Sequence, residues 1–222
     1  MTGGAGATCQ PDLPHLRDCT RCPRLAQFLA DARDTHPGYH ARPVPAFGDA
    51  SPRLLIVGLA PGFHGANRTG RPFTGDYAGE LLYRTLHAFG WGSGPISTSA
   101  DDPLRLHGCR ITNAVKCVPP ENRPLPVEVR TCNGYLQQEL AALAPGSAVL
   151  ALGLVAHGAV LSGLGFPAAR FKFAHGAEHP LSDGSRLFDS YHCSRYNTNT
   201  RRLTEPMFVA VFSAIERFLA QH

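Results

Sequence analysis

Lysine is nearly absent from this chain of 222 residues, because Lys116 and Lys172 are the only two and every other cation is an arginine. The formal net charge of +4 permits a polyanionic partner but does not identify one. Arginine has a planar, forked guanidinium that suits phosphate groups, so the bias is compatible with a nucleic-acid partner. A compositional bias of the genome would produce the same excess of arginine.

The N-terminus, Met1 to Arg17, lacks an apolar stretch, and no signal peptide is therefore expected. Charged residues are absent from 141–169, which raises the question of a membrane span. That segment contains Pro145, His157 and five glycines, a pattern typical of a short buried strand followed by a small-residue helix. We expect a soluble, intracellular protein that has no membrane partner.

Apolar runs that do not alternate with polar residues predict four buried strands, and segments with helical spacing lie between them. The strands are expected at 54–59, 110–116, 148–152 and 186–191, and the helices at 21–36, 76–89, 127–143, 153–164 and 204–219. The segment 171–180 is expected to add a short hairpin at an edge. This alternation predicts an α/β fold with a central, mostly parallel four-stranded sheet that is covered on both faces.

The chain is expected to comprise a disordered tail, residues 1–14, and a single domain, residues 15–222. Three unusual loops, at 58–76, 113–123 and 192–202, each follow a predicted strand. Ligands of such sheets bind in the crevice beyond the carboxyl ends of the strands. We therefore expect the three loops to meet at one edge of the sheet and to form the functional site.

The seven cysteines are an odd number in a chain without an export signal, which argues against a disulfide framework. Cys19 and Cys22 form a CxxC pair, and fourteen residues separate Cys117 from Cys132. Four thiolates from two distant segments can hold a [4Fe–4S] cluster or a zinc ion, and the wide second pair favours iron–sulfur. The alternative is that Cys117 and Cys132 are small core residues. Three further cysteines are left out of the site: Cys9, Cys109 and Cys193.

The loop Gly58–Asp76 is rich in glycine and lies between a predicted strand and a predicted helix. Such a turn offers backbone N–H groups to an anion or a polar ligand. The loop has neither a Gly-Lys-Ser/Thr sequence nor a GxGxxG sequence, which excludes a Walker loop and a dinucleotide-binding fingerprint. Two of its residues have structural alternatives, because Asp76 suits an N-cap and Phe73 suits a core.

Asn113 interrupts a strand that is otherwise mostly apolar. Its amide can read both a donor and an acceptor on a base edge, although it can also bond the neighbouring backbone. The loop from His192 to Arg202 combines hydroxyls, amides and arginines, a composition that suits phosphate contacts. A solvated polar loop is the alternative explanation.

Together these segments resemble family 5, the UDGb type, of the uracil-DNA glycosylase superfamily. The resemblance rests on Arg68-Thr-Gly-Arg-Pro-Phe-Thr-Gly-Asp76, on Thr112-Asn-Ala-Val-Lys-Cys-Val-Pro-Pro120, and on the loop that begins at His192. Cys19, Cys22, Cys117 and Cys132 are similar to the cysteines that hold the iron–sulfur cluster of families 4 and 5. The four matches occur in the same order as in the family and span nearly the whole chain.

The resemblance implies a three-layer α/β/α fold and hydrolytic excision of uracil and other deaminated bases, such as hypoxanthine, from DNA. It implies that Gly58 and Ala60 line the substrate pocket, that Phe73 stacks on a flipped base and that Asn113 bonds its edge. His192 would donate a hydrogen bond to the departing base. The [4Fe–4S] cluster would be structural and would take no part in the reaction.

The sequence departs from related families at two positions. Related families have a polar or acidic residue at the position of Leu59, and this residue helps to activate water. Leu59 is apolar, as is typical of family 5. Asp76 is then the carboxylate expected to polarise water or to stabilise the positive sugar. Cys193 replaces a proline found in many relatives, so the resemblance does not fix the conformation of the local turn.

Base excision repair requires extrusion of the damaged nucleotide from the duplex. The residues expected to hold phosphates and to fill the gap are Arg195, Asn197, Arg201 and Arg202. A Schiff-base lyase needs a free amine, so the scarcity of lysine favours a monofunctional enzyme. We expect a monomer in the cytoplasm, associated with the nucleoid of a prokaryotic cell. Two alternatives are a non-catalytic iron–sulfur protein of the same fold that binds damaged DNA, and an iron–sulfur protein that acts on free nucleotides.

Overall fold

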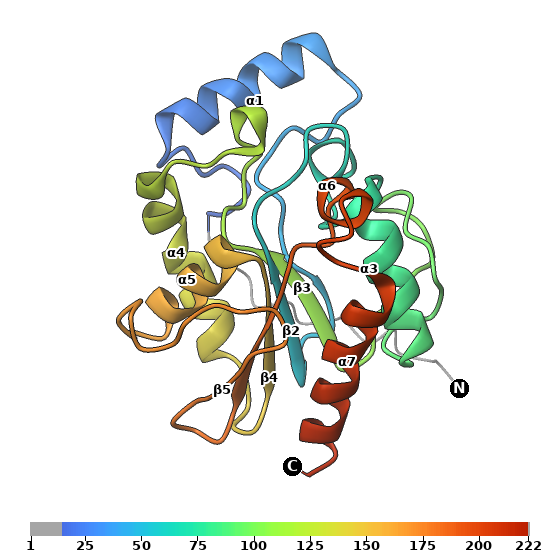
Figure 1. Ribbon diagram of the computed structural model, residues 1–222. Coiled ribbons are helices and arrows are strands. Elements are labelled where there is room, and N and C mark those ends of the chain that lie inside the picture. Colours follow the sequence, from blue (N-terminus) through green and yellow to red (C-terminus); the bar gives the residue numbers. More distant parts are fainter. Residues whose placement is uncertain (1–14, 222) are drawn as a thin grey trace, which may run out of the picture.

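A six-stranded sheet forms the centre of the computed structural model, which describes residues 15–221 (Figure 1). The strand order is β1-β3-β2-β4-β6-β5. Their bounds are β1 (Phe47–Gly48), β2 (Leu54–Gly58), β3 (Cys109–Asn113), β4 (Ala148–Leu152), β5 (Glu178–Pro180) and β6 (Arg186–Ser190). The predicted tail, residues 1–14, lies outside the described residues.

The four inner strands are parallel and are the four that the sequence predicts. The predicted strand count was nevertheless too low, because β1 and β5 add antiparallel edges to the sheet. These strands have two and three residues, which is too short for a recognisable pattern of side chains. The edge strand expected within 171–180 is present as β5, which pairs with β6.

Helices cover both faces of the sheet, so the three-layer α/β/α architecture is confirmed (Figure 1). Helices α3 and α7 pack on one face against Leu54 and Ile56, and helices α4 and α5 pack on the other against Leu55 and Val57. Successive side chains of a strand point to opposite faces, and all five residues of β2 are buried. The helices are α1 (Pro23–Thr35), α2 (Ala66–Thr69), α3 (Tyr77–Ala88), η1 (Pro120–Asn122), α4 (Pro126–Ala141), α5 (Leu154–Gly163), α6 (Arg195–Asn199) and α7 (Glu205–Leu219).

Helix α1 lies outside the two main cores and packs on the segments that follow β2 and β3. Leu25 and Leu29 of α1 form a separate cluster with Val115, Val118 and Tyr135. The helix therefore covers the loops that leave the carboxyl ends of two neighbouring strands, and Figure 1 shows it at the top of the molecule.

A fully buried ion pair fixes the end of β3 to α4. Lys116 Nζ lies 2.7 Å from Glu139 Oε2, and both side chains are at most 1% exposed. The hydroxyl of Thr112 donates to the same carboxylate at 3.0 Å. Removal of one partner from a buried pair typically costs about 3–5 kcal/mol, so this pair holds residues 112–116 in one conformation.

Within residues 15–221, no helix has the length and the apolar character that are needed to cross a bilayer.

Candidate functional site

The loops after β2, β3 and β6 come together at one edge of the sheet, as the alternation of strands and helices predicts. Gly58 at the end of β2 is the register partner of Asn113 at the end of β3. Phe73 from the first loop stacks on His192 from the last, with ring centroids 5.8 Å apart and planes inclined by 25°. Three segments far apart in the sequence therefore contribute side chains to one place.

Gly58 leaves the space in which Phe73 and Asn113 approach each other. A Cβ atom at position 58 would lie 2.6 Å from ring carbons of Phe73 and would also overlap Oδ1 of Asn113. Real Cβ atoms do not approach other heavy atoms so closely. A glycine is therefore required here by the close approach of its neighbours rather than by its own backbone angles.

Phe73 adopts a left-handed backbone conformation, with φ of +54°. This region is costly for a residue with a bulky side chain and persists only where the surroundings enforce it. The ring is 6% exposed and also contacts the core formed by α3 and α7. The alternative that Phe73 is a core aromatic is thus partly correct, because Phe73 packs in this core and also stacks on His192.

Asn113 carries an unpaired acceptor in the interior. Its side chain is 3% exposed, and Oδ1 has no hydrogen-bond partner within the described part of the chain. A buried polar atom without a partner is rare and costs free energy. The alternative that the amide bonds the neighbouring backbone therefore does not hold for this oxygen.

The two carboxylate oxygens of Asp76 have different surroundings. Oδ1 accepts a hydrogen bond of 3.0 Å from the backbone N–H of Gly79, so the N-cap of α3 is confirmed. Oδ2 faces the glycine-rich loop, where a Cβ atom built on Gly65 would lie 2.5 Å from it and one on Gly62 would lie 3.4 Å away. Burial raises the pKa of this carboxyl above its ordinary value.

His192 is held with an uncharged ring at neutral pH. Burial lowers its pKa to about 4, because desolvation disfavours the imidazolium. Its backbone carbonyl accepts a hydrogen bond of 2.8 Å from Nδ2 of Asn197. That amide nitrogen, expected to contact DNA, is therefore engaged within the chain and positions the segment that carries His192.

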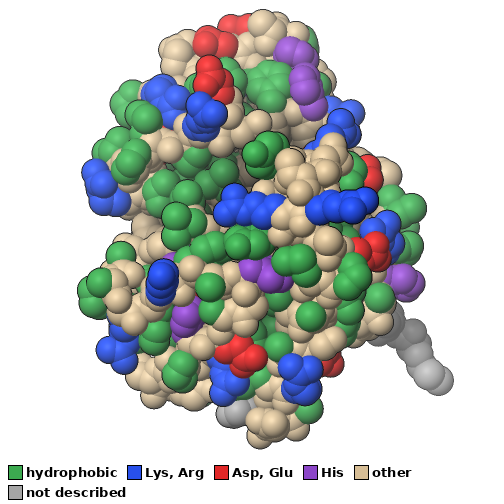
Figure 2. All heavy atoms as spheres, in the orientation of Figure 1, with side chains coloured by type: hydrophobic (Ala, Val, Ile, Leu, Met, Phe, Trp, Pro, Cys, Tyr) green, Lys and Arg blue, Asp and Glu red, His purple; other side chains and the backbone are tan. Residues whose placement is uncertain are grey.

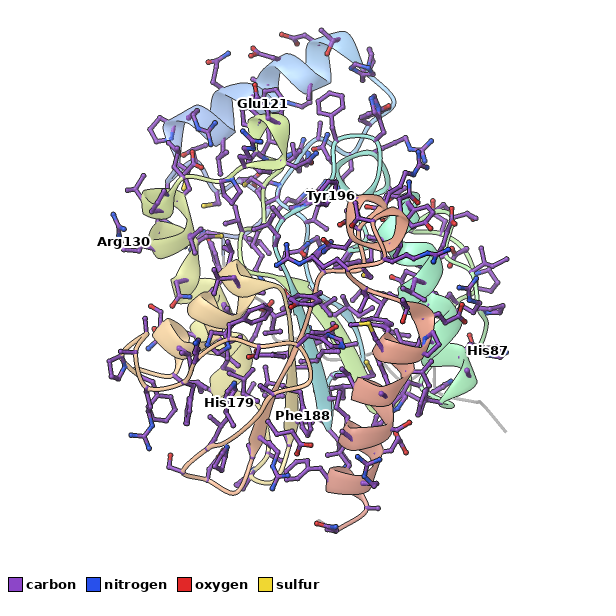
Figure 3. The ribbon with its side chains drawn as sticks, viewed as in Figure 1. His87, Glu121, Arg130, His179, Phe188 and Tyr196 are labelled. Atoms are coloured by element: carbon purple, nitrogen blue, oxygen red, sulfur yellow. The ribbon has the colours of Figure 1, made fainter. Side chains whose placement is uncertain are left out.

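The segment after His192 is not the continuous loop that its composition predicts. Residues Arg195–Asn199 form the short helix α6, because the hydroxyl of Ser194 accepts from the backbone N–H of Asn197 at 3.4 Å and caps the helix. The N-cap signal of Ser194 was available in the sequence and was overlooked. The helix places Tyr196 on the surface with 71% of its area exposed, and Figure 3 labels this residue beside α6.

Arginine side chains surround a groove beside Asp76. The groove has a volume of about 770 Å³, and its lining includes Arg68, Arg84 and Arg195. The guanidinium of Arg195 lies over the ring of Tyr77 at 5.1 Å from its centroid. Figure 2 shows basic side chains in a band across the front of the molecule at the height of α6. Arg201 and Arg202 are exposed near the C-terminal end of α6.

Four of the cysteines line one small cavity. Cys19 and Cys22 precede α1, Cys117 follows β3, and Cys132 lies in α4, and all four contribute to the lining. None forms a disulfide. The four thiols of these three segments therefore line one common space. Cys109 and Cys193 are buried in the core beneath α3 and α7, whereas Cys9 lies outside the described residues.

A network around Arg71 holds the bend that contains Phe73, and sequence reasoning missed it. The guanidinium is 5% exposed, forms an ion pair with Asp102, and donates to the hydroxyl of Ser97 at 3.0 Å and to the carbonyl of Ala100 at 2.5 Å. The partners are 26 to 31 residues away in the sequence, so no local pattern could reveal them.

The other side of the bend is fixed by hydroxyl groups. Tyr83 donates to the carbonyl of Pro72 at 2.7 Å, and the hydroxyl of Thr74 lies 2.8 Å from that of Ser97. Residues 71, 72 and 74 are thus each tied to α3 or to the segment 97–102. These bonds enforce the left-handed conformation of Phe73 that lies between them.

Comparison with known proteins identifies the family. The model of the uracil DNA glycosylase superfamily matches residues 45–216. A type-5 uracil-DNA glycosylase of Thermus thermophilus is 46% identical, over 91% of this chain and 94% of the relative. The chain belongs to the type-5 uracil-DNA glycosylase family.

Further relatives separate this type-5 chain from a neighbouring type. A type-5 uracil-DNA glycosylase of Pyrobaculum aerophilum is 45% identical, over 85% of this chain and 84% of the relative. A type-5 uracil-DNA glycosylase of Mycobacterium bovis is 41% identical, over 96% of this chain and 82% of the relative. A type-4 uracil-DNA glycosylase of Pyrobaculum aerophilum is only 34% identical, over 68% of the chain. These type-5 proteins thus have a higher sequence identity to this chain than the type-4 protein has, and they match a larger part of it.

Removal of the carboxylate of Asp102 is expected to destabilise this type-5 glycosylase. Asp102→Asn leaves the buried guanidinium of Arg71 without its counter-charge, so the free energy of unfolding should fall by about 3 kcal/mol. The matched control is Glu205→Gln, which removes the exposed Arg84–Glu205 pair and should cost about 0–1 kcal/mol. Chemical denaturation measures both, and equal losses for the two variants would refute the role assigned to the network.

The same pair predicts a pH dependence. Burial alone would raise the pKa of Asp102, but the hydrogen bond from Arg71 and three backbone N–H groups lower it to about 2. The stabilisation is therefore complete above the ordinary pKa of 3.8 and is lost as the pH falls toward 2. Asp102→Asn lacks this titrating group, so the difference in free energy of unfolding between wild type and variant should be constant above pH 3.8 and should shrink as the pH falls toward 2, which denaturation at several pH values measures.

Proposed function

We propose that this chain is a monofunctional DNA glycosylase that hydrolyses the N-glycosidic bond of uracil and of other deaminated bases, such as hypoxanthine, in DNA. The observation that carries the proposal is the convergence of Phe73, Asn113 and His192 at one sheet edge, with Asp76 in the adjoining loop. The names of the type-5 relatives support uracil as a substrate.

The residues at this sheet edge suit a planar base that has been turned out of the duplex, and we place the base pocket here. Phe73 offers an aromatic ring for stacking, and Oδ1 of Asn113 offers an unpaired acceptor to an N–H group on the base edge. Gly58 keeps both groups close together. Ala60 follows two residues later and is half-buried, so we place it and Gly58 in the lining of the pocket.

Two different residues stabilise the two charges of the proposed transition state. As the glycosidic bond breaks, positive charge develops on the sugar and negative charge on the base. Oδ2 of Asp76, which is free of the helix cap, stabilises the sugar and orients the attacking water. Because its pKa is about 4, His192 is neutral and donates an N–H hydrogen bond to the departing base.

Extrusion of the base requires contacts to the DNA backbone and a group that fills the gap. We assign the backbone contacts to the exposed arginines Arg195, Arg201 and Arg202. Tyr196 follows Arg195 in α6, and its high exposure suits insertion into the base stack. Asn197 acts mainly through its bond to the carbonyl of His192.

A monofunctional reaction agrees with the state of the lysines. A lyase step through a Schiff base needs an uncharged, accessible amine. Lys116 is fully buried and paired with Glu139, so its amine cannot reach a substrate. The other lysine, Lys172, is exposed but lies between α5 and β5 and not in the loops after β2, β3 and β6. Water is thus the nucleophile in the reaction that we propose.

We propose that Cys19, Cys22, Cys117 and Cys132 hold a [4Fe–4S] cluster. When bound, the cluster cross-links the start of α1, the segment after β3 and α4, and it supplies no redox step. The backbone N–H of Lys116 already donates to Sγ of Cys132 at 3.3 Å, a type of bond that commonly surrounds cluster sulfurs. The site for the cluster and Asn113 thus lie at two ends of one short segment.

The remaining expectations about the chain are also proposals. We propose that residues 15–222 act as a single glycosylase domain and that the enzyme works as a monomer, since its proposed pocket is complete within one chain. We place it in the cytoplasm of a prokaryotic cell, where its substrate, the nucleoid DNA, is found.

Asp76→Asn is expected to abolish most base excision without unfolding the protein. Asparagine caps a helix as well as aspartate does, but it cannot stabilise the sugar cation, so the single-turnover rate on a uracil duplex should fall by about 10²- to 10⁴-fold. The control is Glu80→Gln, an exposed carboxylate that lines the same groove. If both variants excise uracil at the wild-type rate, Asp76 is only a helix cap.

Freshly purified protein is expected to be brown, with broad absorption near about 400 nm and about four irons per chain. Cys117→Ser should lose the colour, whereas Cys193→Ser should keep it because Cys193 lies in a different core. Absorption spectra and metal analysis provide the measurement. A colourless protein with stoichiometric zinc at the four cysteines would contradict the cluster.

A further inference from the structure

Three buried side chains meet on the side of the sheet away from α3 and α7. They are His157 of α5, His179 of β5 and Asp189 of β6. Asp189 is fully buried, and its two oxygens lie 2.8 Å from Nδ1 of His157 and 3.0 Å from Nε2 of His179. Their three possible ligand atoms all lie within 4.8 Å of one another. None of these residues belongs to the proposed active site.

The position of hydrogen atoms on His157 is constrained by a second contact. Nε2 lies 3.1 Å from the carbonyl oxygen of Phe171, and a carbonyl only accepts hydrogen bonds. Nε2 therefore carries the hydrogen. In a neutral ring, Nδ1 then presents a lone pair to Oδ1 of Asp189 across 2.8 Å, an arrangement that is repulsive unless a positive charge joins the two atoms.

The buried carboxylate leads to the same requirement. Within the described residues, the only ion pairs of Asp189 are those with the two histidines. A carboxylate out of contact with water is costly unless a positive charge or several donors compensate it. Either an additional proton on an imidazole or a metal ion must therefore supply positive charge at this place.

We propose that His157, His179 and Asp189 bind a divalent transition-metal ion of the zinc type. Two imidazole nitrogens and one carboxylate oxygen are a common ligand set for Zn²⁺. The N–H of a ligating imidazole usually donates to a carbonyl or carboxylate, as His157 does to Phe171. The ring of Phe171 also stacks on His179, with centroids 4.9 Å apart and planes inclined by 27°, which fixes the second ligand.

The ion would connect the edge of the sheet to α5. Ligand distances of about 2.0–2.1 Å require the facing nitrogen and oxygen atoms to move apart by about half an ångström. Such a movement is small for side chains, and one of the three, His179, lies in the short edge strand β5. The site is structural, because it joins the segment 165–180 to the sheet and lies outside the proposed base pocket.

The test is to titrate Zn²⁺ or Co²⁺ into the purified protein at neutral pH. The cysteine site is left intact. The wild type should bind one further equivalent, and its unfolding temperature should rise with metal concentration. His179→Gln and Asp189→Asn should lose this binding. The control is His175→Gln, a half-buried histidine of the same segment that bonds the backbone N–H of Tyr191 at 3.2 Å and should leave binding unchanged.

The Co²⁺ spectrum separates this site from the cysteines, because ligation by nitrogen and oxygen gives no thiolate-to-metal absorption. Absence of further metal uptake and of a temperature shift would overturn the proposal and would assign the positive charge to a proton on His157. Uptake of the further equivalent by His179→Gln, with thiolate absorption, would place the ion at the cysteines and would overturn the proposal too. Neither outcome depends on base excision, so the proposed function and the metal site fail or stand separately.

Discussion

The close approach of Phe73 and Asn113 at Gly58 is the constraint on which the rest of the site depends. Adjacent parallel strands bring Gly58 and Asn113 into register, and the missing side chain at position 58 lets an aromatic ring enter the space above them. An aromatic ring and an amide oxygen without a partner among the described residues then lie side by side at the end of β2. Neither group could occupy this place if the strand ended in a residue with a Cβ atom.

Bonds outside the pocket keep these groups in place. Arg71 and its partners hold the left-handed bend at Phe73, and the buried Lys116–Glu139 pair holds the segment after Asn113. The side chain of Asn197 restrains the backbone at His192. Each part of the pocket is therefore fixed by polar groups that contact no substrate in the proposed mechanism, and this rigidity suits a reaction that depends on positioned charges.

The inner strands and the long helices could be predicted because their periodicity is local. The predicted strand at 110–116 was three residues too long at its C-terminal end, since residues 114–116 stay buried after the strand pairing ends at Asn113. The sequence offered the N-cap role of Asp76 but could not show that Oδ1 caps α3 while Oδ2 faces the glycine-rich loop. The networks of Arg71 and of Asp189 join residues distant in the chain, and no spacing indicates such contacts.

The most direct test of the pocket is the single-turnover rate of uracil release from duplex DNA by Gly58→Ala. The added methyl group must displace Phe73 or Asn113, so the rate should fall by about 100-fold in a protein that is still folded and still binds DNA. Gly158→Ala is the matched control, since no atom lies within 4 Å of its added Cβ, and it should match the wild type. A wild-type rate for Gly58→Ala would contradict the assignment of the base pocket.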